Sequence, residues 1–63
     1  MTPLEREVLD AIWDGYGIKE IAHKLGLSRS GVERRKYALY RRTGTTNHIQ
    51  LVRHALKAGW IQV

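Results

Sequence analysis

Hydrophobic residues recur at helical spacing in four segments of this chain of 63 residues. The first segment opens with Thr2 as a helix cap, Pro3 at the first helical position and Glu5 as the capping-box partner of Thr2. The turn at residues 14–17 contains two glycines and ends this helix. Its inward side is expected to carry Leu4, Val8, Ala11 and Ile12, with Glu5, Arg6 and Asp10 on other faces.

A second helix is predicted from residue 18 to residue 25, and a third continues to about residue 43. Gly26 fits the C-terminal stop of the second helix, and Ser28 fits the N-cap of the third. The connection between them is three or four residues long and contains a glycine, which is the spacing of a helix-turn-helix. The residues of the second helix expected to face inward are Ile21, Ala22 and Leu25.

A fourth helix is predicted to begin at Asn47, with Gln50 as its capping-box partner, and to stop at Gly59. Its apolar residues form two stripes, whereas a terminal helix needs one buried stripe. The surplus favours a homodimer through this helix, and the alternative is that the first helix covers both stripes. The stripe expected in the core is Leu51, Ala55 and Ala58, and the predicted dimer interface is Ile49, Val52, Arg53, Leu56 and Trp60.

These segments predict an all-α fold, a small four-helix domain containing a helix-turn-helix and spanning residues 1–63. A chain this short buries a small core, and without cysteine it has no disulfide or thiolate–zinc site to reinforce it. The apolar runs are too short to span a bilayer, and no signal peptide is visible. We therefore expect no membrane partner and a cytoplasmic location, either as a free-standing protein or as a domain cut from a larger one.

Charge is concentrated in the third helix. The net charge of the chain is +5, and residues 29–43 alone carry six basic residues against one acid, Glu33. The remaining residues are balanced, with five basic and five acidic side chains. A local basic stripe on a neutral body indicates that a polyanion docks against one face of the domain.

The helical arrangement divides the third helix into an inward side, an outward side and two edges. Val32, Leu39 and Thr43 are expected in the core, while the outward side is suited to the major groove of double-stranded DNA. There Arg34 can donate two bonds to guanine, Glu33 can accept from the cytosine amino group, and Tyr37 can contact a thymine methyl or a phosphate. The cations predicted to meet phosphates are Arg29, Arg35, Lys36, Arg41 and Arg42.

These residues resemble the LuxR-type (GerE-like) helix-turn-helix domain of bacterial transcription regulators, over nearly the whole chain and without gaps. The opening run at residues 2–9 is similar to that of the family. The other matching residues, in order, are Gly15, Lys19, Glu20, Ile21, Ala22, Leu25, Gly26, Leu27, Ser28, Val32, Leu51, Val52, Arg53, Ala55 and Leu56.

The resemblance implies that the third helix enters the major groove and that the fourth commonly forms a dimer interface. By position, it makes Glu33, Arg34 and Tyr37 base-facing, and it places Lys19, Ser30, Arg35, Lys36 and Arg42 near the DNA backbone. A dimer would then bind a near-palindromic site. The chain departs from the usual family residues at Gly17, Gly31, Arg35 and Thr43, where the family has Ser or Thr, Thr, His and Leu.

No catalytic constellation, metal site or cofactor is expected. His48 and His54 are six residues apart on a helix, so they do not share a face, and no cysteine or paired acid joins them. Two alternatives to the LuxR-type function remain open at this stage. One is a protein-interaction module that pairs with a larger regulator or RNA polymerase, and the other is a domain resembling sigma-factor region four.

Overall fold

The computed structural model describes residues 1–61, and this range contains four helices and no strand. The helices are α1 (Pro3–Trp13), α2 (Ile18–Leu25), α3 (Arg29–Thr43) and α4 (His48–Lys57). The predicted all-α class and the helix-turn-helix are confirmed, and the helix boundaries lie within about one residue of the predicted ones. Residues 62–63, at the end of the predicted domain, lie outside the described residues.

Side-chain caps fix the starts of three helices. The Thr2 hydroxyl accepts a hydrogen bond from the Glu5 backbone N–H at 3.1 Å, and the Glu5 carboxylate accepts from the Thr2 N–H at 3.3 Å. The Ser28 hydroxyl accepts from the Gly31 N–H at 3.0 Å. These contacts confirm the predicted capping box of α1 and the predicted N-cap of α3.

The cap of α4 differs from the prediction in one half. Asn47 accepts a hydrogen bond from the Gln50 N–H at 2.9 Å, as expected. The Gln50 side chain, however, accepts from the backbone N–H of Thr46 at 2.9 Å and from its hydroxyl at 3.1 Å, instead of from Asn47. Thr46 offers this oxygen two donors, whereas the Asn47 backbone would offer only one.

A left-handed glycine sets the turn between α2 and α3. Gly26 has φ 68° and ψ 33°, a conformation that residues with a Cβ rarely adopt. The Leu27 N–H donates to the Ala22 carbonyl at 2.9 Å, which closes the end of α2. The half-buried Leu27 side chain packs against the core at the point where the chain enters α3.

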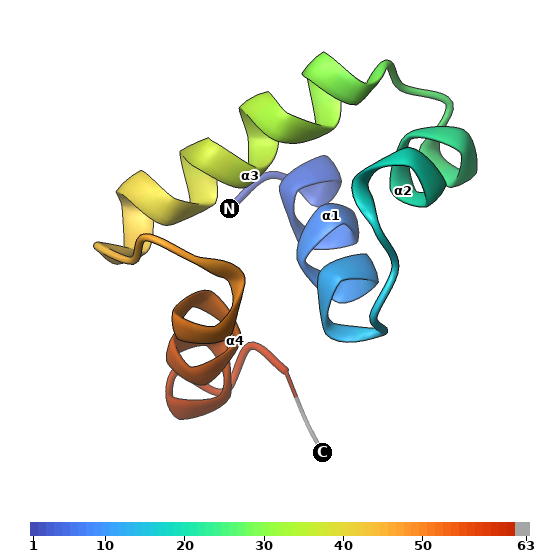
Figure 1. The fold of residues 1–63 in the computed structure, drawn as a ribbon. Helices are drawn as coiled ribbons and strands as arrows, with labels where there is room; N and C mark the ends of the chain where they lie inside the picture. The colour runs from blue at the N-terminus through green and yellow to red at the C-terminus, as the bar shows by residue number, and fades with distance from the viewer. Residues whose placement is uncertain (62–63) are drawn as a thin grey trace.

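α3 packs against each of the other three helices. Figure 1 shows α3 running along one side of the molecule, with α1, α2 and α4 gathered on the other. Val32 and Leu39 on α3 are fully buried, as predicted. The other core residues are Val8, Leu9 and Ala11 on α1, Ile21 and Ala22 on α2, Leu51 and Ala55 on α4, and Ile61.

Two expectations about burial are wrong. Glu5, expected on a face away from the core, is 7% exposed, because its capping contacts hold the carboxylate against the start of α1. Ala58, expected in the core, is exposed because α4 ends at Lys57 and Ala58 serves as the C-cap. After Ala58 the chain turns at Gly59, with φ 76°, and the buried Ile61 packs into the core.

Within residues 1–61, none of the helices combines the length and the apolar character that crossing a bilayer would require.

Truncating a buried side chain of α3 should lower the free energy of unfolding more than truncating an exposed apolar side chain does. Leu39→Ala removes a side chain with 0% exposure and should lower the free energy of unfolding by about 2–5 kcal/mol. Ile49→Ala, at a side chain that is 62% exposed, should change it by less than about 0.5 kcal/mol. Urea titration followed by circular dichroism measures both values, and equal losses would contradict the described core.

Candidate nucleic-acid interface

The outward side of α3 is uncovered by any element in residues 1–61. Its members are all exposed, and Tyr37, at 53%, is one of the most exposed large side chains. Its ring is therefore accessible to a partner. By helical geometry the outward side consists of Ser30, Glu33, Arg34, Tyr37 and Arg41, and all five are exposed.

One edge of α3 carries a cation held by two aromatic rings. The Lys36 Nζ atom lies 5.4 Å from the ring centroid of Tyr37 and 5.9 Å from that of Tyr40. The two rings meet edge to face, with centroids 5.9 Å apart and an interplanar angle of 70°. Partial burial, and then the neighbouring Tyr37, raise the pKa of Tyr40 above its ordinary value of 10.0.

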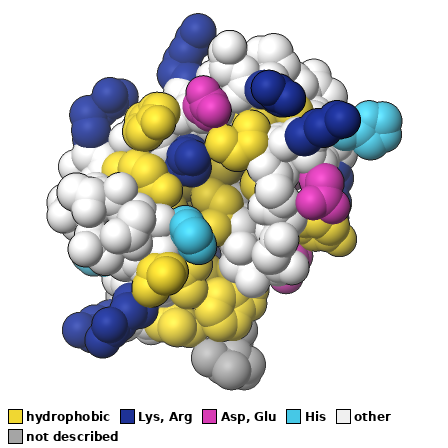
Figure 2. Space-filling model, in the orientation of Figure 1, with side chains coloured by type: hydrophobic (Ala, Val, Ile, Leu, Met, Phe, Trp, Pro, Cys, Tyr) yellow, Lys and Arg dark blue, Asp and Glu magenta, His cyan; other side chains and the backbone are white. Residues whose placement is uncertain are grey.

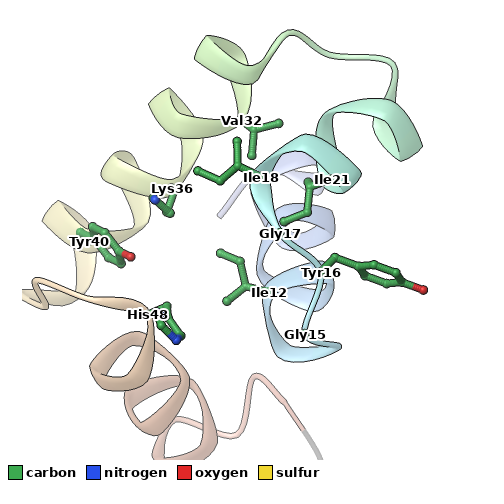
Figure 3. Close-up of a pocket in the computed structure, with 10 residues that line it drawn as sticks. All are labelled: Ile12, Gly15, Tyr16, Gly17, Ile18, Ile21, Val32, Lys36, Tyr40 and His48. Carbon is green, nitrogen blue, oxygen red and sulfur yellow. The ribbon is translucent and has the colours of Figure 1, made fainter.

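Lys36 and Tyr40 also line a depression of about 270 Å³ between the helices (Figure 3). Ile12 and Ile18 give it an apolar wall, and His48 faces it from the start of α4. On this side of the molecule, apolar side chains line the hollow, and Lys and Arg side chains project around it (Figure 2). No three His, Cys, Asp or Glu side chains of the described part of the chain come close enough together to hold a metal ion.

The opposite edge of α3 carries two cations that contact the domain itself. The Arg35 Nη1 atom donates a hydrogen bond to the Gly31 carbonyl at 3.1 Å, one turn back along the helix. The Arg42 Nη2 atom lies 3.8 Å from Glu5 Oε2, across the contact between α1 and α3. Both guanidinium groups are therefore oriented before any partner arrives.

Glu5 joins the start of α1 to the last turn of α3. Hydrogen bonding by the side chain and the backbone of Thr2 lowers the pKa of Glu5 below its ordinary value of 4.5. The charge of Arg42 adds to this effect, and desolvation of the carboxylate opposes it. Glu5 Oε2 is buried and has no hydrogen-bond partner within residues 1–61, and the Arg42 guanidinium lies 3.8 Å from it.

Two predicted backbone contacts lie at the starts of helices. Lys19 is exposed in the first turn of α2, and Arg29 is the first residue of α3 and also exposed. The α2 N-cap, Gly17, has no side-chain acceptor, and the Glu20 carboxylate accepts a hydrogen bond from its N–H at 3.1 Å instead. Lys19 and Arg29 are therefore both accessible to a partner.

Residues 1–55 match the family model described as bacterial regulatory proteins, luxR family (GerE). The chain belongs to this family. It carries the helix-turn-helix domain of a family of transcription regulators, as the resemblance implied. No solved structure matches the chain significantly.

Curated relatives of the LuxR-family domain are regulators from several bacteria. Response regulator Rre1 of Synechocystis sp. is 43% identical over 92% of this chain, and the transcriptional regulatory protein MctR of Rhizobium johnstonii is 37% identical over 94%. The transcriptional regulatory protein UhpA of Salmonella typhimurium is 35% identical over 95%. The chain spans 25%, 28% and 30% of the lengths of these three proteins.

The α4 surface of the LuxR-family domain is only partly free. Leu56 and Trp60 of the predicted dimer stripe pack in part against the core, so α1 and α3 cover more of α4 than the two-stripe pattern indicated. The Trp60 ring also meets His54 edge to face at 5.3 Å. Ile49 is 62% exposed, Arg53 is exposed and Val52 is half-buried, and these three residues form the accessible part of the stripe.

Sequence reasoning missed two features of this interface. The contact between Glu5 and Arg42 joins residues far apart in the chain, and only the capping-box motif hinted that Glu5 turns inward. The hydrogen bond between Arg35 and Gly31 joins residues four apart on one helix. Two features of the sequence could have indicated this hydrogen bond: the spacing of four residues and the absence of a side chain at Gly31.

The Glu5 carboxylate should make the stability of the LuxR-family domain depend on pH. Because folding lowers its pKa below 4.5, its contribution is fully present above that pH and is lost as pH falls through the folded value. The difference in the free energy of unfolding between the wild type and Glu5→Gln should therefore shrink as pH falls below 4.5. Urea titrations across this range measure the difference.

The matched control is Glu7→Gln, which removes the same charge from an exposed position on α1 without touching the cap. A difference between the wild type and Glu5→Gln that stays constant through the acid range would contradict the role assigned to the Glu5 charge.

Proposed function

We propose that this domain binds double-stranded DNA sequence-specifically, with α3 in the major groove, and that it thereby regulates transcription. The observation that carries the proposal is the exposed outward side of α3, on the one segment whose excess charge equals the net +5 of the chain. The similarity to MctR and UhpA, which are named as transcriptional regulatory proteins, supports it. Since bacterial duplex DNA lies in the cytoplasm, the function implies that location.

In this proposal, side chains at the centre of the outward side read bases, and those around it bind phosphates. Glu33, Arg34 and Tyr37 are exposed at the centre and can reach base edges. Phosphate contacts supply most of the affinity because they release counterions. The side chains assigned to phosphates are Lys19, Arg29, Ser30, Arg35, Lys36, Arg41 and Arg42.

We further propose that two copies bind together through α4. Ile49 is the most exposed of the large apolar side chains in the described residues, and it lies beside Val52 and Arg53 on the accessible part of the stripe. A two-fold arrangement would set two α3 helices into successive major grooves, roughly 34 Å apart, on a near-palindromic site. The free chain need not dimerise strongly, because DNA holds the two copies at high effective concentration.

Binding to duplex DNA at increasing salt concentration tests the function directly. We expect the logarithm of the binding constant to fall linearly with the logarithm of salt concentration, with a slope of about −0.9 for each phosphate contact. Fluorescence anisotropy with a labelled duplex measures this slope. Folded protein that binds no duplex, even at low salt, would refute the proposal.

Two variants separate base reading from phosphate binding. Arg34→Ala should relax the sequence preference obtained by selecting duplexes from a random pool, and each lost base contact should reduce discrimination by about 1–3 kcal/mol. Lys36→Ala should weaken all sequences alike and reduce the magnitude of the salt slope by about 1. Finding these two effects interchanged would overturn the assignment of central and flanking roles.

A charged residue on the free part of α4 should separate self-association from folding. Ile49→Glu places the charge at an exposed position, whereas a charge at Leu56 would also disturb the core. The variant should keep the midpoint of thermal unfolding of the wild type. On a duplex with two half-sites, however, it should bind as single copies without cooperativity. Sedimentation of the protein–DNA complexes measures the number of copies bound. Arg6→Glu, on the exposed side of α1, is the control.

A further inference from the structure

The Arg35 side chain extends along the surface of α3 toward the N-terminal end of the helix. Its Nη1 atom donates to the Gly31 carbonyl at 3.1 Å, and the side chain is half-buried there. Helical side chains lean toward the N-terminus, so a long side chain can reach the carbonyl four residues back. The charge of Arg35 therefore sits closer to the start of α3 than the Cα atom of Arg35 does.

Gly31 lies directly beside this guanidinium. A Cβ atom at position 31 would lie 3.7 Å from Arg35 Nη1, which is ordinary van der Waals contact, and 3.3 Å from the capping Ser28 hydroxyl. The backbone of Gly31 is helical and has no positive φ, so the turn itself does not require glycine there. Glycine inside a helix lowers helix stability relative to alanine. Any side-chain atom beyond Cβ at this position would have to share the surface of the helix with the guanidinium that the Cβ atom already touches.

The displacement also moves the charge toward the outward side of α3. Four residues of an α-helix span 400°, so Gly31 lies roughly 40° around the helix from Arg35, on the side away from the buried Val32 and Leu39. Arg35 lines a depression of about 300 Å³ together with Thr2, Glu5, Arg34, Ala38 and Arg41. Three arginines against one carboxylate give this depression a net positive charge, which attracts a phosphate.

We propose that Gly31 and Arg35 act as one unit that binds a DNA phosphate near the start of α3. Gly31 is the positioning residue, and the Arg35 guanidinium makes the contact with the donors that the Gly31 carbonyl does not use. The inference rests on the proposed DNA binding and adds Gly31 to the residues that act in it.

The test compares Gly31→Thr with Gly31→Ala, each with Arg35 and with Arg35→Ala. Alanine adds only a Cβ atom in ordinary contact with Nη1, whereas threonine adds two γ atoms to the space of the guanidinium. Binding to a short random-sequence duplex is measured at several salt concentrations, since a phosphate contact does not depend on sequence. Thermal unfolding of each variant separates binding from folding.

We expect Gly31→Thr to bind about fivefold more weakly than Gly31→Ala when Arg35 is present, and at least as tightly when Arg35 is alanine, because the threonine hydroxyl can then donate to the phosphate. Arg35→Ala alone should weaken binding about tenfold and reduce the magnitude of the salt slope by about 0.9. Arg6→Ala removes the same charge from α1 and should leave the slope unchanged. In the free protein, proton NMR contacts between Gly31 and the Arg35 side chain should survive in Gly31→Ala and vanish in Gly31→Thr.

The possible results separate this inference from the function on which it rests. If the wild type binds the duplex but the two Gly31 variants bind alike with Arg35 present, Gly31 does not position Arg35 and the inference is wrong, while DNA binding stands. If Gly31→Thr is equally weak without Arg35, its effect does not pass through the guanidinium, which also refutes the inference. If the folded wild type binds no duplex, DNA binding itself fails and the phosphate site falls with it.

Discussion

The burial of one side of α3 is the contact on which the arrangement of this domain depends. Val32 and Leu39 are fully buried against the other helices, and they lie on a helix that packs against each of the others. Because these two side chains fix the rotation of α3 about its axis, they also decide which residues face the solvent. A rotation of about 100°, the angle between consecutive residues, would expose Val32 and Leu39. It would bring either Glu33 and Tyr40 or Gly31 and Ala38 to their places, which buries a carboxylate in the first case and leaves the core underfilled in the second. The core therefore determines the orientation of the charged surface.

The structure also distributes the charge of α3 unequally. Arg34 and Arg41 are exposed, whereas Arg35, Lys36 and Arg42 each contact another group of the domain. A uniform stripe of mobile cations would attract any polyanion with little preference for its orientation. Cations held at defined positions favour one alignment of a partner over others, which is what reading a sequence of bases requires.

Most of the fold could be predicted from local chemistry, and most of the errors came from contacts between distant segments. Thr2, Ser28 and Gly26 carry signals whose meaning depends only on a few neighbouring residues, so the helix ends were predictable. The burial of Glu5 depends in part on α3, and no local pattern reports that. Ala58 fits the inward periodicity of α4, but the helix ends one residue earlier and Ile61 takes the place in the core. The outward side of α3 was predictable because its periodicity is regular, whereas the paths of individual long side chains were not.

The pair of tyrosine rings around Lys36 has a consequence for the entropy of association. A free lysine side chain loses roughly 2 kcal/mol of rotamer freedom when it is fixed in a complex. The ammonium group of Lys36 already lies beside the pair of Tyr37 and Tyr40, at 5.4 Å and 5.9 Å from their ring centroids, so part of that loss occurs when the domain folds. The same two rings are rigid and have few rotatable bonds, so ordering them adds little. At this edge of α3, a partner therefore meets a cation whose motion has already been restricted.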